Sequence, residues 1–152
     1  MKSNVRLVNE NNDFFREWII EEWKHHNSID PIYELRIIDP KGISFAENEK
    51  YYKILNNEEM VGFIGIKENS KEIYLFRIFI TEEYRGNGIG HLSLNKLIEM
   101  AKDKNKDLIL DVLEGNKAQK LYESVGFKNY SHQMVLKINE DTYMDPNGGL
   151  EK

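Results

Sequence analysis

The sequence predicts a mixed α/β fold in a single domain, with a central, mostly antiparallel twisted sheet flanked by helices. Three strand-like runs, at 50–56, 60–67 and 72–80, follow one another across short polar turns, which is the pattern of an antiparallel meander. A glycine-rich turn and an amphipathic helix come directly after the last run. A chain of 152 residues is an ordinary size for one domain with its own core.

The N-terminal region predicts a strand at 5–8 and a helix at 11–26. Aspartate–proline pairs at 30–31 and 39–40 bound a short second helix, because a residue before proline is disfavoured in the helical conformation. The surplus of acidic side chains lies in this part of the chain. It is mildly consistent with a cationic substrate nearby, but a solvated acidic surface that aids solubility explains it more simply.

The run at 72–80 predicts a central strand that is buried on most of both faces, since nearly every residue is β-branched, aromatic or aliphatic. Residues 81–83 form a turn. Four apolar residues beyond the glycines share one helical stripe, namely Leu94, Leu97, Ile98 and Ala101. Strand, glycine turn and helix therefore follow each other without a gap.

The C-terminal part predicts a strand at 107–113, a helix at 116–124 and a strand at 132–138. Beyond these the chain loses apolar residues and carries a proline and paired glycines. We therefore expect a single domain over 1–140 and a frayed tail over 141–152.

The run Tyr84–Gly90 has the features of a phosphate-binding turn. Its three glycines alternate along the run, so the backbone can approach a ligand closely and present successive N–H groups. The following helix directs the positive end of its dipole at the same place. Arg85 adds a cation with two donors that suit an oxyanion.

Two better-known phosphate motifs fit this run poorly. A nucleotide P-loop requires Lys-Ser/Thr after its last glycine, whereas His91 and Leu92 stand here. The dinucleotide fingerprint requires G-x-G-x-x-G followed by an acidic residue about 20 positions later. Asp107 and Asp111 satisfy the second condition, but the glycine spacing and the preceding meander do not fit. A domain that binds ATP or NAD through this turn remains a remote alternative.

The run resembles the pyrophosphate signature of the GNAT superfamily, the acyl-CoA-dependent N-acyltransferases. Its pattern Arg/Gln-x-x-Gly-x-Gly/Ala is matched by Arg85, Gly88 and Gly90. A second block resembles that family's next strand, loop and helix at Asn116, Ala118, Leu121, Tyr122, Gly126 and Phe127. Two blocks in the right order make the resemblance specific. It covers residues 72–128 closely and the remaining chain by general layout.

The resemblance implies a GNAT-like sheet that splays between the strands at 72–80 and 107–113, with acetyl-CoA as co-substrate in the gap. The backbone of Phe79 and Ile80 would pair with the pantetheine amides as with an added strand. Asn116 would bind the pantetheine arm, although asparagine is also a favoured cap for the helix that follows. The pyrophosphate would be held by Arg85, Gly86, Asn87, Gly88, Ile89 and Gly90.

Tyr122 matches the tyrosine that often protonates the leaving thiolate in related enzymes. A tyrosine of pKa about 10 is a weaker acid than a thiol of pKa about 8.5, so complete proton transfer is uphill by about 2 kcal/mol. We therefore expect Tyr122 to act as general acid or as hydrogen-bond donor to the developing thiolate. The alternative is a core tyrosine, because its stripe includes Ala118, Leu121 and Val125.

The general base is not assigned by the sequence. Only the neutral amine can attack, and an alkylamine of pKa about 10.4 is about 0.04% neutral at pH 7, so a base is expected. Where many family members carry glutamate on the strand before the turn, this chain has Tyr74. Glu72 lies two residues earlier on the same strand face and is the candidate base, acting through water. Its alternative role is a solvated charge at a strand end.

Composition excludes several other functions. The chain has no cysteine, so disulfides, thiolate metal sites and a cysteine nucleophile are absent. A net charge of −5 argues against nucleic-acid binding. No run reaches the length of a membrane span, and the N-terminus lacks the apolar core of a signal peptide, so we expect a cytoplasmic protein. The adjacent His25 and His26 lack the spacing of a metal site, and no metal is expected.

The sequence is therefore interpreted as an acyl-CoA-dependent N-acetyltransferase that transfers acetyl to a primary amine by direct attack on the thioester. The alternative is a non-catalytic module or regulator that binds CoA on the same fold. Tyr74 at the usual carboxylate position favours that alternative, and Tyr122 disfavours it. No motif specifies the acceptor, whether small molecule or peptide, or the preferred acyl chain. The oligomeric state is also open, and a homodimer is compatible with this size.

Overall fold

The computed structural model describes residues 2–29, 40–112 and 118–131, with 134, 136, 143–144 and 150–151. Its strands are β1 (Val5–Glu10), β2 (Glu49–Asn56), β3 (Glu59–Glu68), β4 (Glu72–Ile80), β5 (Asp107–Leu110), β6 (Tyr143–Met144) and β7 (Leu150–Glu151). Its α-helices are α1 (Arg16–Ile29), α2 (Ile89–Asp103) and α3 (Ala118–Ser124). Single 3-10 turns are η1 (Asn12–Phe15), η2 (Pro40–Gly42) and η3 (Glu82–Tyr84).

One five-stranded sheet organises the domain, with the strand order β1-β2-β3-β4-β5. The first four strands pair antiparallel, and β5 joins β4 in parallel. The β2–β3 turn requires a left-handed backbone, with φ of 52° at Asn57 and 70° at Glu58. Asparagine tolerates this conformation well, and the tight reversal sets the hairpin register. The expected mostly antiparallel meander is therefore confirmed.

The sheet opens between β4 and β5. The two strands pair only where Glu72–Leu75 lies beside Asp107–Leu110, so the second half of β4 has no partner strand on that side among the described residues. This is the splay that the family resemblance implied. The strand expected over 107–113 is four residues long and ends at Leu110, and the early end leaves the β4 edge open.

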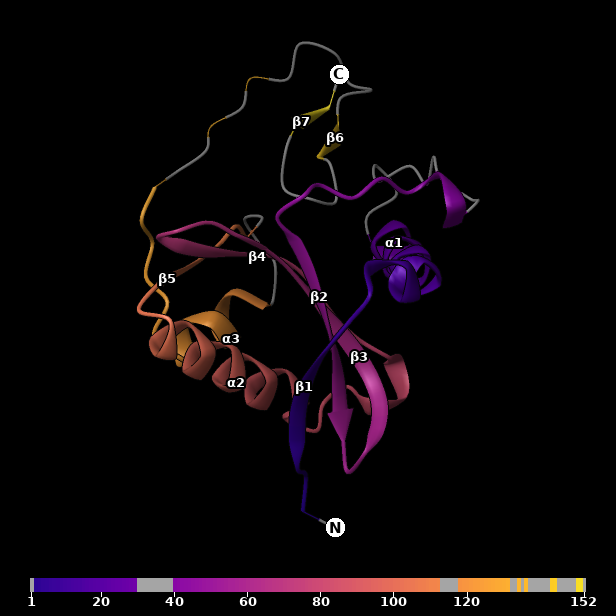
Figure 1. The fold of residues 1–152 in the computed structure, drawn as a ribbon, viewed down its shortest axis with the longest axis horizontal. Helices are drawn as coiled ribbons and strands as arrows, with labels where there is room; N and C mark the ends of the chain where they lie inside the picture. Colours follow the sequence, from indigo (N-terminus) through magenta and orange to yellow (C-terminus); the bar gives the residue numbers. More distant parts are fainter. Residues whose placement is uncertain are drawn as a thin grey trace.

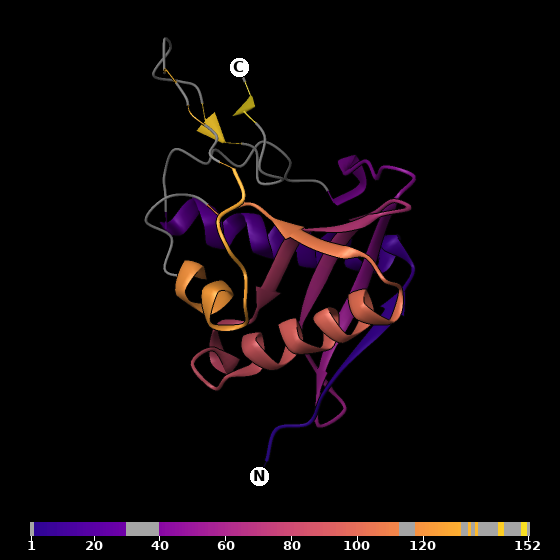
Figure 2. The same ribbon diagram turned by 90° about the vertical axis from the view of Figure 1, so that its left-hand side faces the viewer.

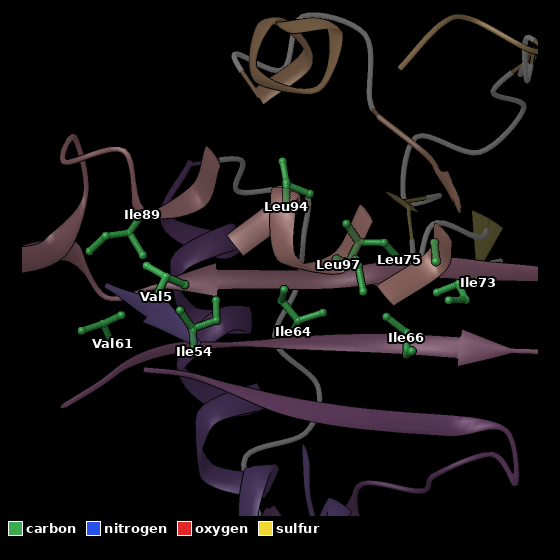
Figure 3. Packing of buried hydrophobic residues seen from close by; sticks show 11 residues of the cluster. Val5, Ile54, Val61, Ile64, Ile66, Ile73, Leu75, Ile89, Leu94 and Leu97 are labelled. Carbon is green, nitrogen blue, oxygen red and sulfur yellow. The ribbon is translucent and has the colours of Figure 1, made fainter. Parts of the chain in front are cut away.

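The sheet is covered on both faces. Helix α1 lies on one face, and α2 and α3 lie on the other, as the two perpendicular views agree (Figures 1 and 2). The α2 face is aliphatic and is built from Val5, Ile54, Val61, Ile64, Ile66, Ile73, Leu75, Ile89, Leu94, Leu97 and Ala101 (Figure 3). The α1 face is largely aromatic and is built from Phe15, Ile19, Ile20, Ile43, Tyr51, Phe63 and Phe79.

A β-bulge in β4 changes which side chains meet α1. Gly65 pairs with Arg77 and Ile66 pairs with Leu75, so Phe76 is an extra residue without a partner position on β3. Odd-numbered residues before the bulge pack on the aliphatic face, whereas Phe79 beyond it packs on the aromatic face. The bulge therefore turns Arg77 and Phe79 toward α1.

Most of the other expected elements are found close to their predicted bounds, with three further exceptions. The N-terminal helix begins with η1 before α1 takes over. The strand predicted at 132–138 is wrong at Met134 and Leu136, which are exposed by 90% and 84% and belong to no strand. The second helix predicted within 30–39 lies outside the described residues. In the tail, β6 pairs with β7. No helix of the described part is long and apolar enough to cross a membrane.

Candidate active site

The open edge of β4 forms one wall of the candidate site. Phe79 and Ile80 lie on the unpaired half of the strand, where main-chain groups on the side away from β3 face no other strand of the described residues. On the other side β3 approaches closely, because a Cβ at Gly62 would collide with the carbonyl oxygen of Phe79. Glycine at this position fixes where the open edge lies.

The glycine turn stands at the end of this edge. Gly86 and Gly88 have φ of 79° and 77°, which is the left-handed region, and a Cβ at either would meet nothing within 4 Å. These two glycines are therefore required by conformation and not by crowding. Gly88 is the N-cap of α2, and the first helical hydrogen bond runs from the Leu92 N–H to the Gly88 carbonyl. The three amides before Leu92 are left without a helical partner, as a bound anion requires.

Arg85 ties the turn to both β4 and α1. Its Nε donates to the Ile80 carbonyl at 2.7 Å, and its guanidinium carbon lies 5.4 Å from the ring centroid of Phe79. Its Nη1 lies 3.3 Å from Nδ1 of His25, which must accept because arginine only donates. Burial, and then the charge of Arg85, lower the pKa of His25. His25 is therefore part of this corner of the molecule.

Tyr122 lies on α3 across the gap from β4. Its ring packs 5.9 Å from that of Phe127, edge to face, and the side chain is half-buried. Gly90 at the start of α2 brings the elements together, because its Cβ would lie 3.5 Å from both Ile80 and Leu121. Burial, and then the negative charge of Glu22, raise the pKa of Tyr122. Its hydroxyl is thus a protonated donor at neutral pH.

Glu72 is not brought to the turn. It is the first residue of β4, roughly 25 Å along the strand from Ile80. Its N–H donates to Oδ1 of Asn69 at 2.8 Å, and its Oε1 accepts from Nδ2 of Asn69 at 3.4 Å. Tyr74 is nearer the opening, and its hydroxyl donates to Oδ2 of Asp111 at 2.6 Å. Asn116 lies outside the described residues, as do its neighbours 113–117.

A buried ion pair is the part of the site that sequence reasoning missed. Glu22 on α1 and Arg77 on β4 are only 2% and 4% exposed, and Oε1 of Glu22 lies 2.6 Å from Nη1 of Arg77. Arg77 Nε also donates to the Tyr51 hydroxyl at 3.2 Å. The sequence signal was an arginine in the middle of an apolar strand, which requires a buried partner. No cluster of three or more potential metal ligands occurs within the described ranges.

Comparisons with known proteins agree with this geometry. Residues 7–127 match the acetyltransferase (GNAT) family. The ribosomal protein bS18-alanine N-acetyltransferase of Haemophilus influenzae is 36% identical over 108 residues, which is 69% of this chain and 70% of that protein. The thialysine N-epsilon-acetyltransferase of Bos taurus is 45% identical over 58 residues, covering 37% of this chain and 34% of that protein.

A solved structure shares the fold. The ribosomal-protein-alanine N-acetyltransferase of Brucella melitensis biovar Abortus superimposes with a TM-score of 0.64 at 13% identity, over 91% of this chain and 100% of that one. Fold and relatives together define an N-acetyltransferase, and they favour catalysis over a CoA-binding module without turnover. The chain belongs to the GNAT family, whose members use acetyl-CoA as co-substrate.

Proposed function

We propose that this enzyme transfers the acetyl group of acetyl-CoA to the α-amino group of a peptide or protein N-terminus, by direct attack of the amine on the thioester. The observation that carries the acceptor is the match to an alanine N-acetyltransferase of ribosomal protein bS18 over more than two-thirds of both chains. A second acceptor, the ε-amine of a lysine-like amino acid, has the support of a shorter match. The absence of cysteine disfavours a thioester acyl-enzyme.

The cofactor would be held mainly by backbone. The pyrophosphate would meet the amides of Gly86–Gly90 and the start of α2, where the left-handed glycines leave the N–H groups uncovered. The pantetheine arm would pair with the open edge at Phe79 and Ile80. Arg85 would support the turn through its bond to the Ile80 carbonyl, and Asn116 would bind the arm on the opposite side.

Tyr122 would act on the sulfur. As the C–S bond breaks, negative charge develops on sulfur, and a protonated hydroxyl stabilises it by donating a hydrogen bond or, late in the step, its proton. The raised pKa of Tyr122 favours the donor role over early proton loss. For the base, Glu72 could act only through a chain of waters, because it lies at the far end of β4.

The proposal is tested in two stages. Thermal unfolding is measured with acetyl-CoA, CoA, ATP and NAD at about 1 mM each. A ligand present at 100 times its dissociation constant raises the free energy of unfolding by about 2.7 kcal/mol. We expect this stabilisation with the two CoA species only. Thiol release is then measured with a peptide that begins with alanine.

The matched control for the second stage is the same peptide with an acetylated N-terminus and one internal lysine. We expect release with the free N-terminus and background release with the control. Equal release with both would reject the α-amine as acceptor, and stabilisation by ATP or NAD alone would reject the CoA site.

A further inference from the structure

The carboxylate of Glu22 is buried but only half bonded. Oε1 pairs with Nη1 of Arg77 at 2.6 Å, whereas Oε2 accepts no hydrogen bond within the described part of the chain. The indole Nε1 of the adjacent Trp23 is also buried without a partner among the described residues. Buried polar atoms are normally bonded, and Trp23 Nε1 is the one buried side-chain atom without a partner among the described residues, so Oε2 of Glu22 keeps some contact with solvent through which water or a ligand can reach it.

The position of Glu22 on α1 puts it over the open half of β4. Glu22 and His25 are three residues apart on one helical stripe, and each meets a different residue beyond the bulge. Glu22 bonds to Arg77, and the His25 ring lies 5.9 Å from that of Phe79. The carboxylate therefore faces the strand segment that would carry the thioester, from the side opposite α2 and α3.

Tyr122 and Glu22 approach the gap from opposite faces of the sheet. Tyr122 belongs to the layer of α3, and Glu22 to the layer of α1 (Figure 2). The negative charge of Glu22 nonetheless contributes, after burial, to the raised pKa of Tyr122, so the two groups interact electrostatically. A thioester in this opening would have a hydroxyl at one end and a carboxylate at the other.

A purely structural role explains this pair less well. A buried ion pair contributes little to stability compared with well-packed apolar side chains, because desolvation of both charges offsets their attraction. Burial, opposed by Arg77, raises the pKa of Glu22, and a desolvated carboxylate is a stronger base than an exposed one. The charge of Arg77 and its hydrogen bond favour the ionised carboxylate and oppose this rise. The other titratable groups around this pair are Tyr51, Tyr122 and His25.

We propose that Glu22 is the general base, and that its Oε2 takes a proton from the acceptor ammonium; this rests on the proposed function. The neutral amine then forms the C–N bond while the C–S bond breaks. Tyr122 gives its hydroxyl proton to the sulfur and takes one back from the nitrogen, which becomes the neutral amide nitrogen. Glu22 then releases its proton to solvent. The rival base is Asp111, an exposed carboxylate that is already bonded to Tyr74.

The test compares Glu22→Gln with Glu21→Gln, a control on the same helix whose carboxylate is exposed. For Glu22→Gln we expect kcat/KM at pH 7 to fall by about 10²- to 10⁴-fold, as for loss of a general base. The deficit should shrink toward pH 10, where the amine loses its proton unaided. The Glu21→Gln control should keep wild-type rates, and acetyl-CoA affinity should change less than about threefold in both.

Glu22→Gln leaves Arg77 buried without a counter-charge, so a second variant guards against unfolding. Glu22→Gln with Arg77→Met removes both charges and should fold, bind acetyl-CoA and stay slow at pH 7. Near wild-type turnover by Glu22→Gln would overturn this inference and leave the proposed function standing. The same holds if Asp111→Asn, and not Glu22→Gln, shows the loss of rate that shrinks toward pH 10. A wild-type enzyme that binds acetyl-CoA but releases no thiol with any amine overturns the proposed function and this inference with it.

Discussion

The two faces of the sheet are built from different chemistry. The α2 face is a continuous aliphatic layer in which the buried side chains make no ion pair among the described residues (Figure 3). The α1 face combines aromatic rings with the buried pair of Glu22 and Arg77. The guanidinium carbon of Arg77 lies 5.2 Å from the ring centroid of Phe76 and 5.6 Å from that of Trp23.

The two faces are stabilised in different ways. An aliphatic layer is held by the area it removes from water, and it tolerates volume-conserving changes. A charged group among aromatic rings depends on one partner, so each of its atoms has a defined place. The first face positions the glycine turn through α2, and the second is where an acceptor amine would approach. The α1 face is thus the one that buries an ion pair beside the opening.

The largest expected effect on stability is at the ion pair. Arg77→Met should lower the free energy of unfolding at pH 7 by about 3–5 kcal/mol, because the carboxylate of Glu22 is left buried and unpaired. Without Arg77 the folded pKa of Glu22 rises further above its unfolded value. The deficit should therefore be smallest below the unfolded pKa and grow as pH rises through the folded one. Urea unfolding at several pH values measures this, and a deficit independent of pH would contradict the account.

On the aliphatic face the expected loss is similar in size but different in kind. Leu97 is fully buried, and Leu97→Ala should cost about 2–5 kcal/mol from lost contacts and a residual cavity. Since no titratable group is involved, this cost should be constant between pH 5 and 8. A pH-dependent cost in the same urea titration would show that the two faces do not differ as described.

A smaller loss of stability is expected at Gly65, where β3 packs against the aromatic face. A Cβ at Gly65 would lie 2.8 Å from Cε1 of Tyr51 and 3.2 Å from Cβ of Arg77. Gly65→Ala should therefore cost about 1–3 kcal/mol by displacing the Tyr51 ring. Thermal unfolding of this variant is compared with that of Gly86→Ala, whose Cβ meets open space but whose left-handed φ is strained. The comparison separates crowding from backbone strain. Wild-type stability for Gly65→Ala would refute the close packing.

The smallest stability effect is expected at Glu68, a carboxylate at the sheet end with three lysine partners. Although burial raises its pKa, hydrogen bonds from Lys106, Lys104 and Lys50 outweigh it and hold the pKa at about 2. A carboxylate whose pKa is depressed in the folded state stabilises the fold at pH values above its unfolded pKa. This stability is lost as the pH falls from about 4.5 to 2. Glu68→Gln should cost about 1–2 kcal/mol at pH 7, since water screens the lysines, and nearly nothing at pH 2. A constant deficit in acid titration would contradict this.

The glycine turn before α2 could be predicted from the sequence and the buried ion pair under α1 could not, for one physical reason. Backbone grips a phosphate through consecutive amides, so the glycines that permit it form a local pattern in the sequence. Glu22 and Arg77 are 55 positions apart and meet only through tertiary packing. The bulge at Phe76, which turns Arg77 toward α1, also leaves no local pattern. The strand expected at 132–138 shows the converse error at Met134 and Leu136, because apolar residues in alternation do not ensure a pairing partner.

The central claim is that amine acetylation occurs in the gap between β4 and α3, with Tyr122 serving the leaving sulfur. Its most direct test is thiol release from acetyl-CoA with an alanine-initiated peptide, by the wild type and by Tyr122→Phe. The account predicts amine-dependent release that falls about 10- to 100-fold in the variant, as for loss of a hydrogen bond to a charged group, with acetyl-CoA affinity unchanged. Equal rates in the two proteins would contradict it.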